Sequence, residues 1–271
     1  MNRFFTMLLC TAFANNIQAQ ELFTYTEPAS NMPVKAIGIR ANNFVMQPRV
    51  ASQKTAYNVA PEIMVGLSKK IMVHGEAFFG NKMNQFNFDG ASFYAKYRFL
   101  SNDDVHRHFR MAFYGKVATS NIIINQNAID LTGRNSGAEL GLVATQLINK
   151  IAISAGGSFV NAFDNGNNNK LGAIKNANKA INYNLSLGKL FLPKTYENYN
   201  QVNVNGMVEW LGQTNTFSGK TFIDVAPSIQ FIFYSKARLD VGYRFPLIDH
   251  LKRNYNKGFL VRFEYNFFNA F

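Results

Sequence analysis

Residues 258–271 read GFLVRFEYNFFNAF, and the alternation within this stretch decides the fold. Every second side chain is apolar or aromatic: Phe259, Val261, Phe263, Tyr265 and Phe267. The positions between them include Arg262, Glu264 and Asn266. A period of two is typical of a β-strand, whose successive side chains point to opposite faces. Lipid outside and a polar lumen inside would explain why one face is greasy while the other carries charges.

The same alternation recurs along the chain. We expect about twelve such segments, starting near residues 35, 57, 70, 91, 108, 137, 150, 180, 201, 221, 236 and 258. They run about 10 residues, the length of a tilted strand across a bilayer, whereas strands of soluble proteins are usually about half as long. A soluble sandwich would bury the apolar face, but successive charges on the other face favour a barrel. The sequence therefore predicts an all-β, antiparallel, up-and-down transmembrane β-barrel.

The connections between these segments fall into two classes that alternate along the chain. The mostly short ones are 68–70, 101–106, 148–150, 191–200 and 234–236, and the longer ones are 43–56, 80–90, 120–136, 161–179, 212–220 and 248–257. This pattern predicts periplasmic turns and longer outer loops, with both chain ends on the periplasmic side. Pro61 and Pro227 would each remove one ladder hydrogen bond, so we expect them near the rim or at a bulge.

The N-terminus predicts export. Residues 1–20 read MNRFFTMLLCTAFANNIQAQ, in which Arg3 precedes a short apolar core and Ala19 offers a small residue for cleavage. This order is typical of a secretory signal peptide, and the apolar run is too short for a spanning helix. Cys10, the only cysteine, lies inside it. We therefore expect a cysteine-free mature chain in the cell outer membrane, with the barrel in residues 34–271.

Residues 21–33, ELFTYTEPASNMP, precede the first strand and are predicted to form a periplasmic N-terminal leader. Pro28 and Pro33 make the segment extended or turned. Two alternatives remain for it. A mobile leader is the favoured one, because chain termini are commonly poorly ordered. The other is a plug that folds into the lumen.

A family resemblance adds to this pattern. An aromatic last residue, Phe271, on an amphipathic final strand resembles the signal that the outer-membrane assembly machinery recognises. The stretches ELFTYTEPASNMPVKAIGIR (21–40), SFYAKYRFLSNDDVH (92–106) and GLVATQLINK (141–150) resemble outer-membrane β-barrel proteins of the Bacteroidetes type. More weakly, VAPSIQFIFYSKARLDVGYRFPL (225–247) is similar to a hairpin of aromatic-degradation-type outer-membrane transporters. The resemblance implies a barrel but brings no reaction and no catalytic residues.

The polar face of the predicted strands holds the candidate functional residues. The charged or titratable side chains expected to line the lumen are Arg40, Glu62, His74, Glu76, Lys96, Arg98, Arg110, Lys116, Glu139, Glu209, Asp224, Arg238, Asp240, Arg244, Arg262 and Glu264. Acids and bases are nearly balanced, which allows two interpretations. One is an ion-pair lattice that stiffens and nearly fills the barrel. The other is a narrow water-filled channel with opposed charges, and a barrel of this size permits either.

Enzyme chemistry has little support. A lipid-acting enzyme would need a Ser-His pair oriented by a third group. The histidines are His74, His106, His108 and His250, and none is followed two residues on by serine. His74 next to Glu76 suits a structural pair, and no His pair beyond His106-x-His108 has the spacing of metal ligands. We therefore predict no catalytic residues, no metal and no cofactor.

The leading interpretation is a passive channel or facilitator for small hydrophilic or amphiphilic solutes. A largely closed barrel with a structural or surface-binding role is the alternative, and a lipid-acting enzyme comes third. Expected partners are outer-membrane lipid and lipopolysaccharide, the assembly machinery and an unidentified small solute, with the chain as a monomer. Basic loop residues either pair with lipopolysaccharide phosphates or are solvated: Lys170, Lys175, Lys179, Lys252, Arg253 and Lys257. The net charge of +12 does not indicate nucleic acid, because the chain is exported and membrane-buried.

Overall fold

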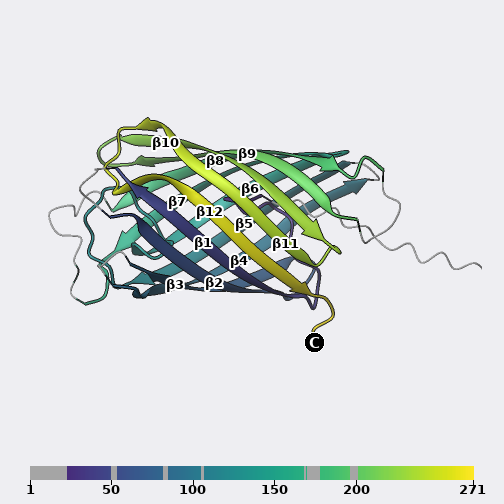
Figure 1. The fold of residues 1–271 in the computed structure, drawn as a ribbon, viewed down its shortest axis with the longest axis horizontal. Coiled ribbons are helices and arrows are strands. Elements are labelled where there is room, and N and C mark those ends of the chain that lie inside the picture. Colours follow the sequence, from purple (N-terminus) through teal and green to yellow (C-terminus); the bar gives the residue numbers. More distant parts are fainter. Residues whose placement is uncertain are drawn as a thin grey trace, which may run out of the picture.

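The computed structural model describes residues 23–49, 54–81, 85–104, 107–167, 169, 178–195 and 201–271, so the predicted signal peptide lies outside the described residues. The described chain forms one closed barrel of antiparallel strands in which each strand pairs with its neighbours in sequence (Figure 1). The first strand closes the barrel against the last, for example through Arg40 opposite Glu264. The predicted all-β, up-and-down barrel is confirmed.

The barrel contains the expected twelve strands in the described part of the chain. They are β1 (Ile37–Pro48), β2 (Ala56–Gly66), β3 (Ile71–Gly80), β4 (Asn87–Asp104), β5 (Arg107–Ser120), β6 (Ser136–Ile148), β7 (Ile151–Phe163), β8 (Lys179–Leu192), β9 (Asn203–Asn215), β10 (Thr221–Phe233), β11 (Ala237–Asp249) and β12 (Tyr255–Phe267). The shortest has 10 residues and the longest 18, so all are long enough to cross a bilayer when tilted. Among the described residues, no helix is long and apolar enough to cross a membrane.

The first strand begins and the last strand finishes at the same rim of the barrel. The Lys35 amide donates to the Gly66 carbonyl beside the β2–β3 turn, and the Lys35 carbonyl accepts from the Ala270 amide after β12. This end also carries the β4–β5, β6–β7, β8–β9 and β10–β11 connections, as an even number of antiparallel strands requires. The assignment of this end to the periplasm stays a prediction from loop length.

The outer surface of the barrel is apolar and the interior is polar. Outward side chains such as Leu140, Ile63 and Phe263 are 72%, 56% and 56% exposed, whereas inward Glu209 and Asp240 are fully buried. A soluble protein would bury the first group and hydrate the second. In the described chain, no second sheet and no helix covers the outer face (Figure 1), which excludes a soluble sandwich. An apolar outer face of this kind is suited to contact with lipid.

The two prolines depart from expectation. Pro61 and Pro227 lie in the middle of β2 and β10 and face outward, where they pair with Ala41 and Val208. On the other side of each proline the ladder is interrupted without a register shift. The prediction of a rim or bulge position is therefore wrong. A proline lacks only one N–H, so a strand can hold it in mid-length by giving up pairing on one side.

Candidate functional site in the barrel lumen

The described part of the N-terminal segment, residues 23–33, runs through the lumen. The Glu209 carboxylate on β9 accepts hydrogen bonds from the amides of Thr24 (2.8 Å), Tyr25 (2.8 Å) and Thr26 (2.9 Å). It also accepts from the Thr26 hydroxyl at 2.8 Å. One fully buried acid thus satisfies three consecutive main-chain donors, an arrangement that holds the segment by its backbone.

A buried base holds the same segment from another wall. The Lys96 ammonium on β4 donates to the carbonyls of Pro28 (2.6 Å) and Ser30 (2.7 Å). The Ala29 amide between them donates to the Thr145 hydroxyl of β6 at 2.9 Å. Charged and hydroxyl side chains of the wall therefore replace the water that main-chain groups outside a helix or strand would otherwise bind.

Apolar contacts at two positions also hold the segment in place. Phe23 packs with Leu147, Ala152 and Met207, and it is 2% exposed. Ala29 packs in a separate cluster with Ala112 and Val143, beside Tyr114. The structure places residues 23–33 inside the lumen, as the plug alternative describes. Local sequence carries no signal for this outcome, because the partners of the segment lie on distant strands.

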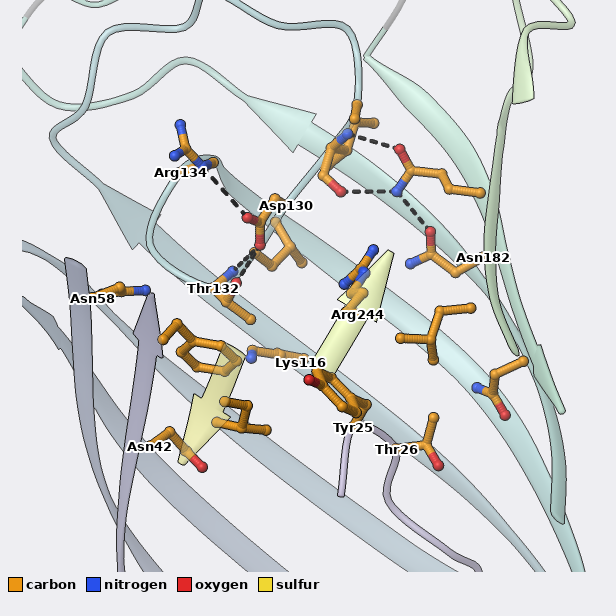
Figure 2. A pocket seen from close by; sticks show the side chains of 18 of the residues that line it. Tyr25, Thr26, Asn42, Asn58, Lys116, Asp130, Thr132, Arg134, Asn182 and Arg244 are labelled. Atoms are coloured by element: carbon orange, nitrogen blue, oxygen red, sulfur yellow. Dashed lines mark hydrogen bonds and ion pairs between the residues drawn. The ribbon is translucent and has the colours of Figure 1, made fainter. Parts of the chain in front are cut away.

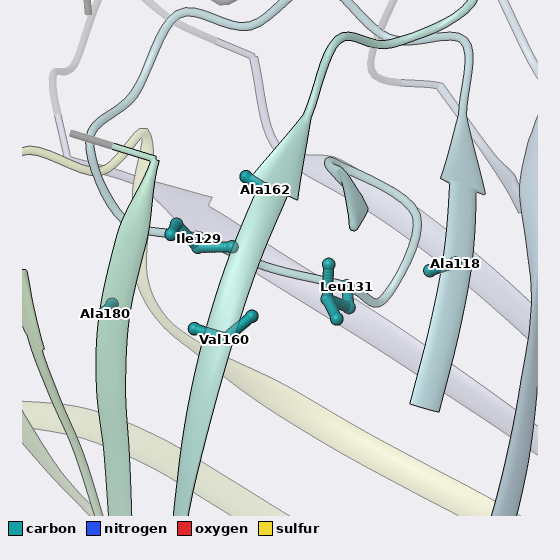
Figure 3. Packing of buried hydrophobic residues seen from close by; sticks show 6 residues of the cluster. All are labelled: Ala118, Ile129, Leu131, Val160, Ala162 and Ala180. Carbon is teal, nitrogen blue, oxygen red and sulfur yellow. The ribbon is translucent and has the colours of Figure 1, made fainter. Parts of the chain in front are cut away.

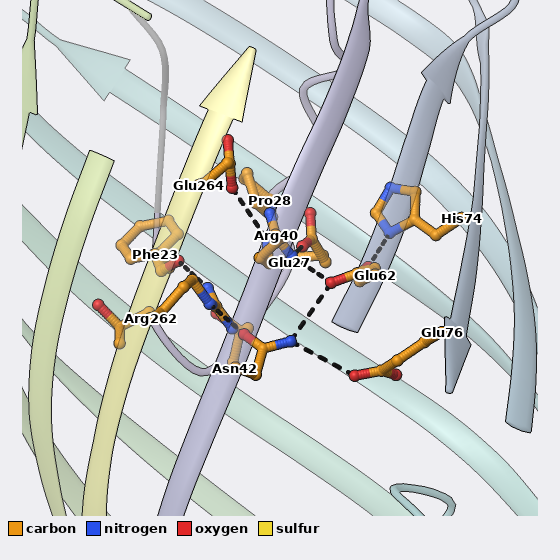
Figure 4. Close-up of polar contacts among 12 residues, drawn as sticks. Phe23, Glu27, Pro28, Arg40, Asn42, Glu62, His74, Glu76, Arg262 and Glu264 are labelled. Atoms are coloured by element: carbon orange, nitrogen blue, oxygen red, sulfur yellow. Dashed lines mark hydrogen bonds and ion pairs between the residues drawn. The ribbon is translucent and has the colours of Figure 1, made fainter. Parts of the chain in front are cut away.

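An ion-pair network lies on one wall of the lumen and contacts the segment through Glu27 (Figure 4). Arg40 lies at its centre, 2.8 Å from Glu27 of the segment, 3.1 Å from Glu62 and 2.8 Å from Glu264. Glu62 in turn contacts His74 Nδ1 at 2.6 Å. Each carboxylate therefore has a cation or donor within reach, which is what makes such burial tolerable.

The network continues along the inner wall. Asn42 donates to Glu76 at 3.4 Å and accepts from Arg262 at 2.6 Å. The Arg238 guanidinium lies 3.0 Å from Glu264 and 3.2 Å from Asp240. Lys116 lies 3.4 Å from Glu76, and the Asp224 carboxylate binds Arg244 at 2.5 Å. The near balance of charge seen in the sequence corresponds to a network of ion pairs around Arg40 and a separate pair between Asp224 and Arg244.

The structure places the predicted lumen residues on inward-facing positions of the strands. Most of them join these ion pairs or hold the segment. Arg98 instead lies near the β2–β3 turn, where it donates to the Lys69 carbonyl at 2.6 Å. Arg110 pairs with Asp103 at 2.8 Å and also donates to the Ser30 hydroxyl at 2.9 Å.

Arg253 is a lumen residue that the sequence analysis missed. It follows β11 in a connection assigned to a basic outer loop, yet it is 5% exposed. Its guanidinium binds Asp224 at 2.6 Å and Asp249 at 2.7 Å. Burial alone would lower the pKa of Arg253, but these hydrogen bonds and carboxylates raise that pKa above its ordinary value. Arg253 is therefore unavailable to lipopolysaccharide, whereas Lys252 and Lys257 are exposed.

The connection between β5 and β6, residues 121–135, folds into the mouth of the barrel. Figure 3 shows Ile129 and Leu131 of this connection against inward alanine and valine side chains of β5, β7 and β8: Ala118, Val160, Ala162 and Ala180. Gln213 on β9 clamps the loop, accepting from the Ile129 amide and donating to its carbonyl, each at 2.8 Å. Small wall residues thus leave room for a loop that the sequence analysis did not place inside.

A cavity of about 430 Å³ lies inside the barrel, lined by the N-terminal segment and by the β5–β6 loop. The residues that line it include Tyr25, Lys116, Arg244, Asn182 and Asp130 (Figure 2). We call this cavity the chamber. Its walls combine aromatic faces, amides and charges that already have partners.

The described residues show no metal centre, since no group of three His, Cys, Asp or Glu side chains could hold an ion. His74 is bound to Glu62, and His108 lies 2.8 Å from Asp103 near the short-turn end. His250 follows β11 in a connection between strands, and His106 lies outside the described residues.

Comparison with known proteins supports the fold. No family model and no curated protein matches the chain. Among solved structures, an outer-membrane channel from Pseudomonas putida F1 is similar, with 12% identity, a TM-score of 0.53, and coverage of 89% of this chain and 100% of the channel. The β domain of the Bordetella autotransporter BrkA has 14% identity, a TM-score of 0.50, and coverage of 86% and 100%. The KdgM porin has 10% identity, a TM-score of 0.48, and coverage of 85% and 99%. At such identities the likeness extends to the fold alone, that of an outer-membrane β-barrel, and the Bacteroidetes-type resemblance rests on sequence stretches.

Proposed function

We propose that this protein is an outer-membrane channel for small hydrophilic or amphiphilic solutes, whose opening is limited by its own N-terminal segment. The observation that carries the proposal is the chamber of about 430 Å³ inside a twelve-stranded barrel. Eight strands leave an interior that side chains just fill, and sixteen leave an open pore. Twelve strands leave space that this chain divides between a peptide segment, a loop and a cavity.

The chamber suits small solutes with both polar and apolar parts. Its volume falls within the range of small-molecule sites, about 300–1,000 Å³. Tyr25 and Tyr114 offer aromatic faces, while Asn182 and Asn42 offer amide groups. Lys116 and Arg244 are already paired with Glu76 and Asp224. A solute can therefore bind without leaving an isolated charge buried, which would be costly.

A largely closed barrel with a structural or surface-binding role is the second candidate. The contacts of residues 23–33 with Glu209 and Lys96 favour it, because they occupy part of the lumen. These contacts are polar, so water that enters the lumen can replace them when the segment leaves. We therefore favour a segment that can move out of the lumen over a permanently closed barrel.

The proposed location is the outer membrane, supported by the apolar outer face. Phe271 is 57% exposed and accessible to assembly machinery. Lys179, Lys252 and Lys257 are exposed and could bind lipopolysaccharide phosphates. A monomer remains our proposal for the assembly, because the closed barrel leaves no strand edge to pair with a second copy.

Planar-bilayer recording tests the proposal. The complete mature chain should give small or infrequent discrete openings, and a variant lacking residues 23–33 should give larger and more frequent ones. Heat-dependent migration in gels would show that both proteins are folded. Folded protein that stays silent in both forms would overturn the channel and support the closed barrel.

A further inference from the structure

We propose that the lumen contains a binding site for a peptide in a bent, non-strand conformation, recognised mainly through main-chain atoms, which residues 23–33 of the same chain occupy. The occupied site is the restriction in the proposed channel, so the effect on conduction rests on the proposed function. Binding of the peptide does not. The ligand class is a peptide that can adopt this bent conformation, and the same peptide should bind when it is supplied in trans.

The contacts are concentrated on the backbone of the segment. Side chains of β9, β6 and β3 accept from main-chain amides: Glu209 from Thr24, Tyr25 and Thr26, Thr145 from Ala29, and Met72 from Met32. Side chains of β12 and β4 donate to main-chain carbonyls: Arg262 to Phe23, and Lys96 to Pro28 and Ser30. Donors and acceptors thus converge from several sides of the lumen on one peptide, which bends at residues 24–26 so that three successive amides reach the same carboxylate.

The wall is arranged for a ligand of this kind and not for a closed core. Glu209 and Lys96 are 0% and 1% exposed, and a buried charge without partners is strongly unfavourable. When the segment leaves, Glu209 keeps the Ser186 hydroxyl at 3.3 Å but loses three amides and the Thr26 hydroxyl. Only water or another backbone could take their place. The empty site should therefore rebind a peptide.

Three side-chain positions give the site its preferences. Phe23 fills an apolar pocket beside Leu147 and Met207. Glu27 pairs with Arg40 at 2.8 Å. Ala29 is fully buried, which leaves no room for a larger residue. The preferred peptide has an aromatic residue, an acid four positions later and a small residue two positions after the acid, while proline at Pro28 is compatible because its carbonyl alone is used.

The test uses the folded variant lacking residues 23–33, in detergent. The probe is the peptide FTYTEPASNMP with acetylated N-terminus and a fluorophore at its carboxyl end, and fluorescence anisotropy measures its affinity. We expect saturable binding. Methylation of the Tyr25 and Thr26 nitrogens in the peptide removes two donors to Glu209 and should weaken binding about tenfold or more. The peptide with Asn31→Ala is the control, because the Asn31 amide has no hydrogen-bond partner, and its affinity should be nearly unchanged.

Two outcomes overturn the inference. One is the absence of saturable binding to the folded barrel. The other is equal affinity of the methylated and unmethylated peptides, which would mean that the backbone is not recognised. On the barrel side, Glu209→Gln should weaken binding, whereas Glu139→Gln should not. Glu139 is a matched lumen acid whose partners are Ser158, Asn182 and Tyr114.

A measurement on the complete chain covers the case in which the shortened variant does not fold. Amide hydrogen exchange at Thr24, Tyr25 and Thr26 should be slow, and Glu209→Gln should speed it about tenfold or more. Fast exchange in the unaltered chain would overturn the inference. Peptide binding by a barrel that never conducts would support the inference and overturn the proposed channel. A barrel that conducts, whose conductance the peptide does not change and which does not bind the peptide, would support the proposed channel and overturn the inference.

Discussion

Replacing Glu209 by glutamine should release the N-terminal segment from the lumen. The substitution keeps the size of the side chain but removes its charge. It also replaces one acceptor oxygen by an NH₂ group, which cannot accept from the amides of Thr24, Tyr25 and Thr26. Those amides lie 2.8–2.9 Å from the carboxylate in the structure.

The expected size follows from these contacts. The carboxylate accepts four hydrogen bonds from the segment, counting the Thr26 hydroxyl. A hydrogen bond to a charged group contributes about 1.5–3 kcal/mol, and glutamine keeps one oxygen, so roughly half of the contacts should be lost. Water entering the lumen recovers part of this, which leaves about 2–4 kcal/mol. The released population should rise about 30- to 1,000-fold.

Thiol labelling measures this population. Asn31→Cys places a thiol on the segment, at a side chain whose polar atoms are buried without a partner. Cys10→Ser removes the one native cysteine. When the segment returns faster than a bulky maleimide reacts, the labelling rate follows the released population. Glu209→Gln should therefore raise the rate about 30- to 1,000-fold.

The control is Glu139→Gln, which makes the same change of charge on β6 without touching the segment. It should leave the labelling rate within about threefold. An unchanged rate in Glu209→Gln would refute the conclusion that this carboxylate holds the segment. Equal acceleration by both variants would refute it as well, since the loss of any lumen charge would then suffice.

Three further outcomes are expected. Lys96→Met should raise labelling of the Asn31→Cys thiol about tenfold, because two segment carbonyls lose their donor; labelling at the original rate would contradict this. Gln213→Ala should free the β5–β6 loop at Ile129 and increase current fluctuations in bilayer recordings, and an equally quiet channel would count against a clamped loop. Leu142→Arg, on the outer face and 53% exposed, should destabilise the barrel in vesicles by about 2–4 kcal/mol in urea titrations, well beyond Leu142→Ala; similar losses for both would argue against a lipid-facing surface.

Alternation in the sequence determined the barrel and the face on which each strand residue lies. In β11, Leu239 and Val241 face outward while Arg238 and Asp240 face the lumen, as their order in the chain predicts. Such an assignment is reliable because a slip of one residue would move every side chain to the wrong solvent. The positions of Pro61 and Pro227 in mid-strand were not predicted from the alternation, because whether a strand pairing can be interrupted depends on the neighbouring strand.

The tertiary structure decided which charges meet and what fills the lumen. Arg40 and Glu264 are 224 residues apart and pair only because β1 closes against β12. Glu209 is 185 residues from Thr24. Arg253 is buried in the lumen beside Asp224, which lies 29 residues earlier in the chain. The alternation of apolar and polar residues is a local property of a chain, and it can be deduced from the order of its amino acids. The partners of a buried charge depend on barrel closure and on the backbone groups that reach it, so only the folded molecule specifies them.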